Sequence, residues 1–358
     1  MHNKEVRVII AASGTGGHLF PAVYIAKAFQ AKCPQLKLVF IGSGRPLEEK
    51  ILGSTEHEHI KVKTFGLKNL GIPGFIRYIF SLPSALVQTF KVFRRVKPQL
   101  VIGVGGYVSV LPVVMARLLG VPTWIHEAEL NPGMANKFLK YFASKISIAF
   151  KEASLADNPK AIYTGHPVRP ELSQVTPGLA MGQAPRKFLV LGGSQGAKAL
   201  DETLPKVLAH FKENDIEVTH QCRKENVEAV KESYQQNGIN ARVIHFIDNM
   251  ADAYSRAHLI IARAGAGTVM EIGVASRPAI FVPYPHAQGD HQTANAMTLV
   301  KAGKAYLVQE GEDFESKLQR AIANMLNPET YFAMKLAKYE SRSLNAAAKI
   351  AEECLKLI

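Results

Sequence analysis

The chain has 358 residues, a length at which two domains are expected rather than one core. Hydrophobic residues make up 47% of it and charged residues 20%, which excludes an intrinsically disordered chain. The sequence has no run of about 18 uncharged apolar residues and no signal-peptide pattern, so we expect a protein that stays in the cytoplasm. Its three cysteines are scattered, which argues against disulfides and a C-x-x-C metal site.

Positive charge is concentrated in the first half of the chain. Residues 1–170 hold 22 Lys and Arg against nine Asp and Glu, whereas residues 171–358 hold 21 of each kind, which gives the whole net charge of +13 to the first half. No acidic residue lies between Glu58 and Glu127. This half therefore offers a surface for anions, whether phospholipid, pyrophosphate or nucleic acid.

Short β-branched segments alternate with stretches of helix length along nearly the whole chain. The expected strands cover residues 6–10, 36–42, 99–103, 122–126, 145–150, 161–165, 187–193, 216–221, 241–246, 257–263, 278–284 and 305–310. This alternation predicts an α/β protein with parallel sheets flanked by helices.

A polar segment rich in proline and glycine, residues 167–186, interrupts the pattern and separates two βα series. We therefore expect an N-terminal domain over residues 1–166 and a C-terminal domain over residues 167–343. The last stretch, residues 344–358, is expected to form a helix that packs back on the N-terminal domain.

Three glycine-rich turns follow expected strands, at residues 13–18 (SGTGGH), 103–107 (GVGGY) and 192–197 (GGSQGA). Each opens a helix, where free N–H groups and the helix dipole favour an anion such as a diphosphate. None is a P-loop or a clean dinucleotide fingerprint, which disfavours ATP hydrolysis and hydride transfer. Glycine here also has a purely geometric explanation, above all at residues 103–106.

A further turn, ARAGAGTVME at residues 262–271, again leads from a strand into a helix. Glu271 is expected in the first helical turn, where its carboxylate can accept hydrogen bonds from a ribose diol. Gln292 offers both a donor and an acceptor to sugar hydroxyls. The simpler interpretation of Glu271 is a charge that favours the helix N-terminus.

Taken together, these motifs resemble the MurG family from about residue 6 to residue 325. The resemblance rests on GTGGH at 14–18, GGY at 105–107, HE at 126–127, G-x-PVR at 165–169, GGSQGA at 192–197, FID-x-M at 246–250, ARAG-x-x-T at 262–268 and the later HQ-x-x-NA. It implies a GT-B fold, two Rossmann-like domains whose sheets face a central cleft. It also implies inverting transfer of N-acetylglucosamine (GlcNAc) from UDP-GlcNAc to the 4-hydroxyl of the muramoyl sugar of lipid I, forming lipid II.

The resemblance also implies the residues that bind the donor. It puts the diphosphate near Ser194 and Arg169, uracil against Ile247, ribose on Glu271 and GlcNAc on Gln292. The remaining donor contacts that it implies are Thr15, Gly16, Gly17, Ala266, Gly267, Thr268, Val269 and Met270. Two positions depart from the family pattern: Glu129 stands where a neutral Asn is usual, with Asn131 two residues on, and His166 replaces another Asn.

Inversion needs a base that takes the proton of the acceptor hydroxyl. His18 is the first candidate, because it follows a phosphate-type turn and its ordinary pKa is near neutral. Glu127 is the second candidate, and a purely structural histidine is the simpler reading of His18. We expect no cofactor and no metal held by the protein, because no Asp-x-Asp and no cluster with metal-ligand spacing occurs; a metal ion bound by the diphosphate itself stays open.

Residues 71–97 combine apolar side chains at helical spacing with Arg and Lys, which is typical of a helix at a membrane interface. The apolar positions are Ile72, Phe75, Ile76, Ile79, Phe80 and Leu82. We expect a peripheral protein on the cytoplasmic face of a bacterial inner membrane with anionic lipid, although a core helix with basic flanks fits the same pattern.

Two other classes of function remain open from the residues. One is another GT-B transferase with a different lipid or small acceptor, or a UDP-sugar epimerase with a similar donor site. The other is a noncatalytic protein that binds a nucleotide sugar or nucleic acid. We expect no nucleic-acid partner, because the basic stretch contains no recognised nucleic-acid module.

Overall fold

The computed structural model describes residues 5–62, 71–175, 179–193 and 195–358, without the side chains of residues 71–81 and 288. The chain forms two compact units, one made of Met1–Arg169 with Arg342–Ile358 and the other of Pro170–Ser341. We call them unit 1 and unit 2. The first crossing lies after Arg169 rather than after His166, so Arg169 belongs to unit 1.

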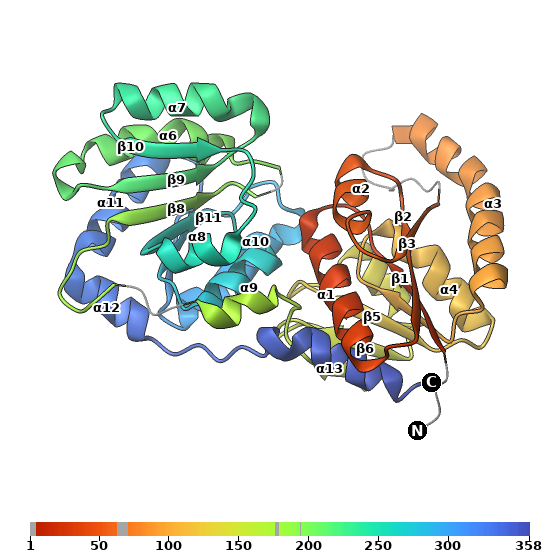
Figure 1. The fold of residues 1–358 in the computed structure, drawn as a ribbon. Coiled ribbons are helices and arrows are strands. Elements are labelled where there is room, and N and C mark those ends of the chain that lie inside the picture. The colour runs from red at the N-terminus through yellow and green to blue at the C-terminus, as the bar shows by residue number, and fades with distance from the viewer. Residues whose placement is uncertain (1–4, 63–70, 176–178, 194) are drawn as a thin grey trace. The chain divides into compact units, whose positions relative to one another are not determined.

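Unit 1 is built on a seven-stranded sheet in which all neighbouring strands are parallel (Figure 1). The strand order is β3-β2-β1-β4-β5-β6-β7, so the winding reverses between β1 and β4. The strands are β1 (Val6–Ala11), β2 (Leu36–Gly42), β3 (Glu58–Lys61), β4 (Leu100–Gly103), β5 (Thr123–Glu127), β6 (Lys145–Ile148) and β7 (Ala161–Tyr163).

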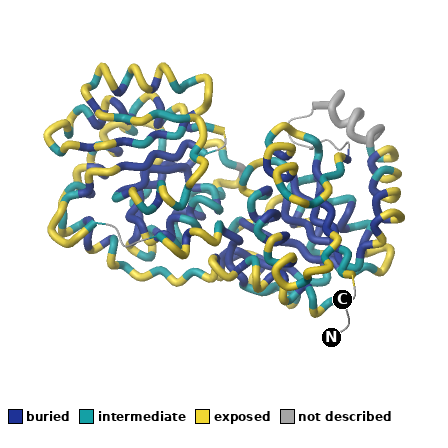
Figure 2. Tube along the Cα trace, viewed as in Figure 1, coloured by how far each residue is buried: buried dark blue, intermediate teal, exposed yellow. Residues whose placement is uncertain are grey.

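Helices cover this sheet on both faces. They are α1 (Gly16–Lys32), α2 (Pro46–Leu52), α3 (Gly71–Val96), α4 (Val110–Leu118), α5 (Met134–Leu139) and α13 (Ser343–Leu355). The last helix of the chain packs on α1, and Ile350 and Cys354 of α13 join Phe29 and Trp124 in one buried cluster. Helices α3 and α4 lie on the other side of the sheet (Figure 1). The strands are therefore buried on both faces, which explains their nearly continuous apolar sequences (Figure 2).

Unit 2 has a six-stranded parallel sheet of order β10-β9-β8-β11-β12-β13, with its reversal between β8 and β11. The strands are β8 (Lys187–Leu191), β9 (Glu217–Gln221), β10 (Asn240–Ile244), β11 (Leu259–Ala262), β12 (Ala279–Phe281) and β13 (Ala305–Leu307). The helices are α6 (Lys198–Ala209), α7 (Val227–Gln236), α8 (Met250–Arg256), α9 (Ala266–Ala275), α10 (His291–Lys301), α11 (Phe314–Leu326) and α12 (Pro328–Leu336). One core cluster joins α6, α7, α11 and α12 to the sheet.

The expected α/β architecture with two parallel sheets is confirmed. Each expected strand is present, usually ending earlier than its sequence segment. Strand β3 was not expected, because its sequence EHIK is polar and lies at the edge of the sheet. Across the described residues, no helix has the length and apolar character needed to cross a membrane.

Candidate active site

The reversal point of the unit 1 sheet brings two of the glycine-rich turns together. The turn after β1 and the turn after β4 are neighbours, and a Cβ added to Gly106 would lie 2.8 Å from Ser13 Oγ. Ser109 Oγ ties the second turn to β1 by donating to the carbonyls of Gly105, at 2.8 Å, and Ala11, at 3.0 Å. Gly105 and Gly106 have φ of 112° and 77°, so this turn requires glycine for its backbone as well as for space.

His18 lies in the first turn of α1, directly against the second glycine turn. A Cβ added to Gly105 would be 2.6 Å from His18 Nδ1, so the ring sits where a side chain would otherwise be. Burial lowers the pKa of His18, and the neighbouring Val104 backbone offsets part of that shift. Nδ1 is buried without a hydrogen-bond partner among the described residues. The imidazole is therefore neutral at neutral pH and able to accept a proton.

Glu127 ends β5 and is buried, with both carboxylate oxygens occupied. Oε1 accepts the N–H of Glu129 at 2.9 Å, and Oε2 accepts the N–H of Gly133 at 3.2 Å and Asn136 Nδ2 at 2.9 Å. Burial nevertheless raises the pKa of Glu127 to about 7. The carboxylate holds the loop between β5 and α5, and its oxygens are less available to a substrate proton than His18 is.

Glu129, at the position where the family usually has Asn, is half-buried beside this carboxylate. Asn131 is exposed.

A chain of buried polar groups lies next to Glu127. His126 Nε2 is 3.1 Å from His166 Nδ1, and His126 Nδ1 is 2.9 Å from Ser147 Oγ, which also accepts the indole N–H of Trp124. Burial lowers the pKa of His166 to about 3 and holds the pKa of His126 well below its ordinary value. Two neutral imidazoles can share a hydrogen bond as donor and acceptor. His166 is thus a structural partner of His126. The backbone N–H of His166 donates to Ser343 Oγ of α13.

Arg169, the last residue of the first segment of unit 1, lies over the ring of Phe20, which packs against the first glycine turn. Its guanidinium carbon lies 5.7 Å from the centre of the Phe20 ring, and Phe20 packs where a Cβ on Gly16 would be, at 3.1 Å. Thr15 and Gly17, on either side of Gly16 in the chain, are exposed at the N-terminus of α1. Thr15, Gly16, Gly17 and Arg169 are therefore brought together in unit 1.

The reversal point of the unit 2 sheet lies between β8 and β11. The turn at residues 192–197 follows β8, and the segment Arg263 to Gly265 follows β11. Ser194 lies outside the described residues. Arg263 is buried and donates to the carbonyls of Val282, at 3.0 Å, and Pro283, at 3.2 Å, and it pairs with Glu310. Arg263 therefore links the segment after β11 to the segment after β12 and to Glu310.

The expected position of Glu271 was wrong by one helical turn. It is the sixth residue of α9, so no acidic residue occupies the first turn of that helix. Its Oε2 accepts the Tyr254 hydroxyl at 3.0 Å, which orients the half-buried carboxylate. The helix begins at Ala266, earlier than the sequence suggested, because Gly265 serves as its N-cap.

The other residues expected to wrap the nucleotide differ in how far they are exposed to solvent. Val269 and Met270 lie in the core of unit 2 and present no side chain to a ligand, and Ala266 is buried too. Gly267 and Thr268 are half-buried. Gln292 is half-buried and its Oε1 accepts the N–H groups of Ala264, at 3.3 Å, and Tyr284, at 2.9 Å, which leaves its NH₂ group for a sugar hydroxyl.

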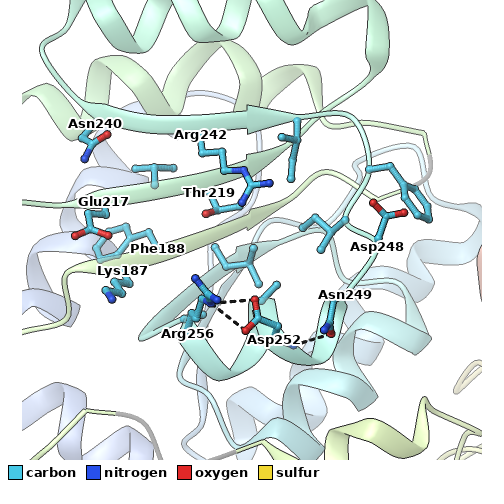
Figure 3. A pocket seen from close by; sticks show the side chains of 17 residues that line it. Lys187, Phe188, Glu217, Thr219, Asn240, Arg242, Asp248, Asn249, Asp252 and Arg256 are labelled. Carbon is cyan, nitrogen blue, oxygen red and sulfur yellow. Dashed lines mark hydrogen bonds and ion pairs between the residues drawn. The ribbon is translucent and has the colours of Figure 1, made fainter.

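Ile247 lines a pocket of about 410 Å³ between α8, the N-terminal halves of β8 and β9, and β10 (Figure 3). Arg242, Arg256 and Asp252 are among its other residues, and Arg256 pairs with Asp252 at 2.9 Å. Among the described residues, none of the others expected to bind the donor lines it. This pocket therefore adjoins the expected uracil position without being the donor site as a whole.

Glu48 is a site residue that sequence reasoning missed. It is fully buried and accepts the N–H of Gly14 at 3.2 Å, of Ser43 at 2.7 Å and of Gly44 at 2.8 Å, as well as the Ser43 hydroxyl. It therefore ties the first glycine turn to the loop after β2. The available signal was Pro46 at the first helical position with Glu48 in the first turn of α2.

Two glycosyltransferase family models match this chain, one in each half of the sequence. The model of the glycosyltransferase family 28 N-terminal domain matches residues 8–148, and that of the C-terminal domain matches residues 188–354. A Myxococcus xanthus protein named UDP-N-acetylglucosamine–N-acetylmuramyl-(pentapeptide) pyrophosphoryl-undecaprenol N-acetylglucosamine transferase is 34% identical over 99% of this chain and 93% of its own length. A Pseudomonas syringae pv. tomato protein of the same name is 36% identical over 99% of both.

Among solved structures, the crystal structure of Acinetobacter baumannii MurG matches with a TM-score of 0.79 and 30% identity, over 98% of this chain and 99% of that one. The UDP-GlcNAc 2-epimerase of Neisseria meningitidis, bound to UDP-GlcNAc, matches with a TM-score of 0.66 and 14% identity, over 98% of this chain and 99% of that one. At that identity the second likeness concerns the fold alone.

Proposed function

Because the chain belongs to glycosyltransferase family 28, we propose that it transfers GlcNAc from UDP-GlcNAc to lipid I, the undecaprenyl-linked muramoyl pentapeptide, and forms lipid II. The observation that carries the proposal is its similarity, along almost the whole chain, to proteins named for this reaction. No observation on the molecule favours the epimerase alternative, whose structural neighbours share only the fold.

His18 is the base in this proposal. As the acceptor 4-hydroxyl oxygen attacks the anomeric carbon, the bond to UDP breaks and the hydroxyl proton passes to the neutral imidazole. Since Nδ1 is buried, Nε2 is the nitrogen assigned to that proton. Glu127 supports the site by holding the β5–α5 loop, because its oxygens already accept three hydrogen bonds.

Donor binding is assigned to the glycine turns and to the side chains that remain accessible near them. The N-terminus of α1 at Thr15, Gly16 and Gly17, with Arg169 beside it, offers N–H groups and a cation to the diphosphate. In unit 2, Glu271 is assigned to the ribose, Gln292 to GlcNAc and the Ile247 backbone to uracil.

A membrane surface on unit 1 is also part of the proposal. Helix α3 buries Ala85, Thr89, Val92, Phe93 and Val96 against the unit, and its opposite face exposes Leu86, Val87 and Phe90 beside basic residues. The apolar positions from Ile72 to Phe80 fall outside the described side chains, and Leu82 is half-buried. An exposed apolar face flanked by Lys91 and Arg94 suits the anionic surface that carries an undecaprenyl-linked acceptor.

The reaction is tested by incubating the full chain with labelled UDP-GlcNAc and a short-chain lipid I analogue. We expect label in the disaccharide lipid, and competition by UDP-glucose and UDP-N-acetylgalactosamine reports donor choice. A 2-epimerase would convert UDP-GlcNAc without any acceptor. Conversion of the donor with no labelled lipid would therefore contradict the proposal.

A further inference from the structure

The ring of His18 lies between two glycines of unit 1. A Cβ added to Gly14 would lie 3.8 Å from His18 Cδ2, and a Cβ added to Gly105 would lie 2.6 Å from His18 Nδ1. Gly14 has φ of 103°, a backbone conformation that residues with a side chain rarely adopt. The place of the imidazole therefore depends on the Gly14 backbone being held in this conformation.

Glu48 holds the Gly14 peptide from the first turn of α2. Its Oε1 accepts the Gly14 N–H at 3.2 Å and the Ser43 hydroxyl at 2.7 Å. Its Oε2 accepts the N–H groups of Ser43, at 2.7 Å, and Gly44, at 2.8 Å. Hydrogen bonds to an ionised, buried carboxylate are strong, so these contacts fix the backbone groups that make them.

The end of β2 leaves space for this carboxylate. A Cβ added to Gly42, the last residue of β2, would lie 2.8 Å from Glu48 Oε2 and 2.5 Å from His59 Nε2. The carboxylate and the imidazole of His59 therefore pack directly on the β2 backbone. Glu48 is confined between the end of this strand and the first glycine turn, with little freedom to move.

Most of the hydrogen bonds of Glu48 serve its own loop. Those with Ser43, Gly44 and Arg45 all lie between β2 and α2. Among the described residues, only the bond with Gly14 leaves this loop, and it reaches a residue 34 positions away in the sequence. That bond leads to the turn on which the His18 ring packs.

We propose that Glu48 is a positioning residue for the catalytic base, which holds the Gly14 N–H and thereby keeps the first glycine turn against the His18 ring. The inference rests on the proposed function, in which His18 takes the proton of the acceptor hydroxyl. It deepens that function by assigning a role to a carboxylate outside the motifs that carry the family resemblance. Glu48 acts through His18 and not by contact with a substrate.

Glu48→Gln breaks this link selectively. Both oxygens of the carboxylate accept N–H groups, whereas an amide has one acceptor oxygen and an NH₂ group that only donates. The Ser43 hydroxyl can turn and accept from that NH₂ group, but the N–H of Gly14 cannot. In Glu48→Gln the amide oxygen is therefore expected to keep the N–H groups of Ser43 and Gly44, and the bond with Gly14 is lost.

The experiment is a double-mutant cycle with His18→Ala, measured as kcat for transfer of labelled GlcNAc to the lipid I analogue. Glu48→Gln should lower kcat by about tenfold in the unaltered chain, because a misplaced base loses rate. It should lower kcat by less than about twofold in His18→Ala, where no base is left to misplace. A merely structural role would cost the same factor in both backgrounds. Equal losses, or no loss in the unaltered chain, would overturn the inference.

Two further variants separate the link from charge and from folding. Glu49→Gln makes the same change at the next residue of α2, an exposed carboxylate paired with Lys61 at 2.5 Å, and should leave kcat unchanged. An equal loss there would show that only negative charge near α2 matters. Glu48→Asp keeps the charge but is shorter by one methylene, so it should retreat from Gly14 and show the same dependence on His18. This variant decides the cycle if Glu48→Gln does not fold, which Trp124 fluorescence reports.

A second measurement needs no acceptor. The pKa of His18 is followed by NMR, and its signal is identified by its absence in His18→Ala. A loosened turn admits water and should raise the pKa of His18 toward its ordinary value of 6.5 in Glu48→Gln, whereas loss of the Glu48 charge alone would lower it. A His18 pKa that is unchanged or lowered would overturn the link.

The two measurements distinguish failure of the inference from failure of the proposed function. If the unaltered chain moves no GlcNAc to lipid I, the proposed function fails, while the pKa of His18 still decides the link to Glu48. If the chain transfers GlcNAc and the losses in the cycle are equal, the inference alone fails.

Discussion

At the scale of single residues, His18 combines a neutral imidazole with a place between two glycine turns. We expect His18→Ala to lower kcat by about a hundredfold or more, as loss of a general base does, with UDP affinity nearly unchanged. Steady-state kinetics with the lipid I analogue and calorimetry with UDP check this. His210→Ala, which removes an exposed histidine at the end of α6, is the control. Near-normal kcat in His18→Ala would exclude it as the base.

Glu127 should make the stability of unit 1 depend on pH. Its pKa is raised from 4.5 to about 7, so the folded chain binds this proton more tightly than the unfolded chain does. The free energy of unfolding should therefore fall as pH rises from about 4.5 to 7, by up to about 3 kcal/mol, and then level off. Glu127→Gln should lack this slope.

The measurement is urea denaturation at several pH values, followed by the fluorescence of Trp124. This is the single tryptophan of the chain, and it is fully buried on β5 in unit 1. Glu152→Gln, which alters an exposed acid of the same unit, should keep the slope of the unaltered chain. An unchanged slope in Glu127→Gln would show that the carboxyl is not protonated near neutral pH.

At the scale of elements, α13 belongs to the core of unit 1 although it ends the chain. Ile350 is fully buried there, so Ile350→Ala should lower the stability of unit 1 by about 2–4 kcal/mol. Trp124 fluorescence during urea denaturation reports this unit. Leu344→Ala changes a residue of the same helix that is 39% exposed and should cost far less. Equal effects of the two variants would mean that α13 is not held in the core.

At the scale of the whole molecule, the net positive charge lies in the first half of the sequence, which forms most of unit 1. Binding to vesicles should therefore rise with anionic lipid and fall with salt. Phe90→Glu should weaken binding to vesicles with anionic lipid, because it places a carboxylate on the exposed face of α3. Sedimentation of the chain with such vesicles measures both effects.

Leu336→Glu is the matched control for that prediction. Leu336 is 67% exposed at the end of α12 in unit 2, so the same change there should leave vesicle binding nearly as it was. Indifference of the unaltered chain to both lipid charge and salt would contradict the membrane surface.

The α/β class, the approximate place of each strand except β3, and the glycine turns at both sheet reversals can all be predicted from the amino-acid sequence. These are local properties: β-branched runs, helical spacing and glycines at strand ends act within a few residues. It also identified His18 and Glu127 as the polar residues to examine. Edge strand β3 was not predicted, because its polar sequence has no such periodic pattern.

The contacts that those residues make come from the folded chain. The partners of Glu127 and Glu48 and the His126–His166 pair join segments distant in the sequence or fix loops that no periodicity predicts. The side chains of Val269 and Met270 lie in the core, because which face of a helix is buried depends on its neighbours. Burial and hydrogen-bond partners also set the pKa values of His18 and Glu127, which follow from the folded chain and not from the sequence.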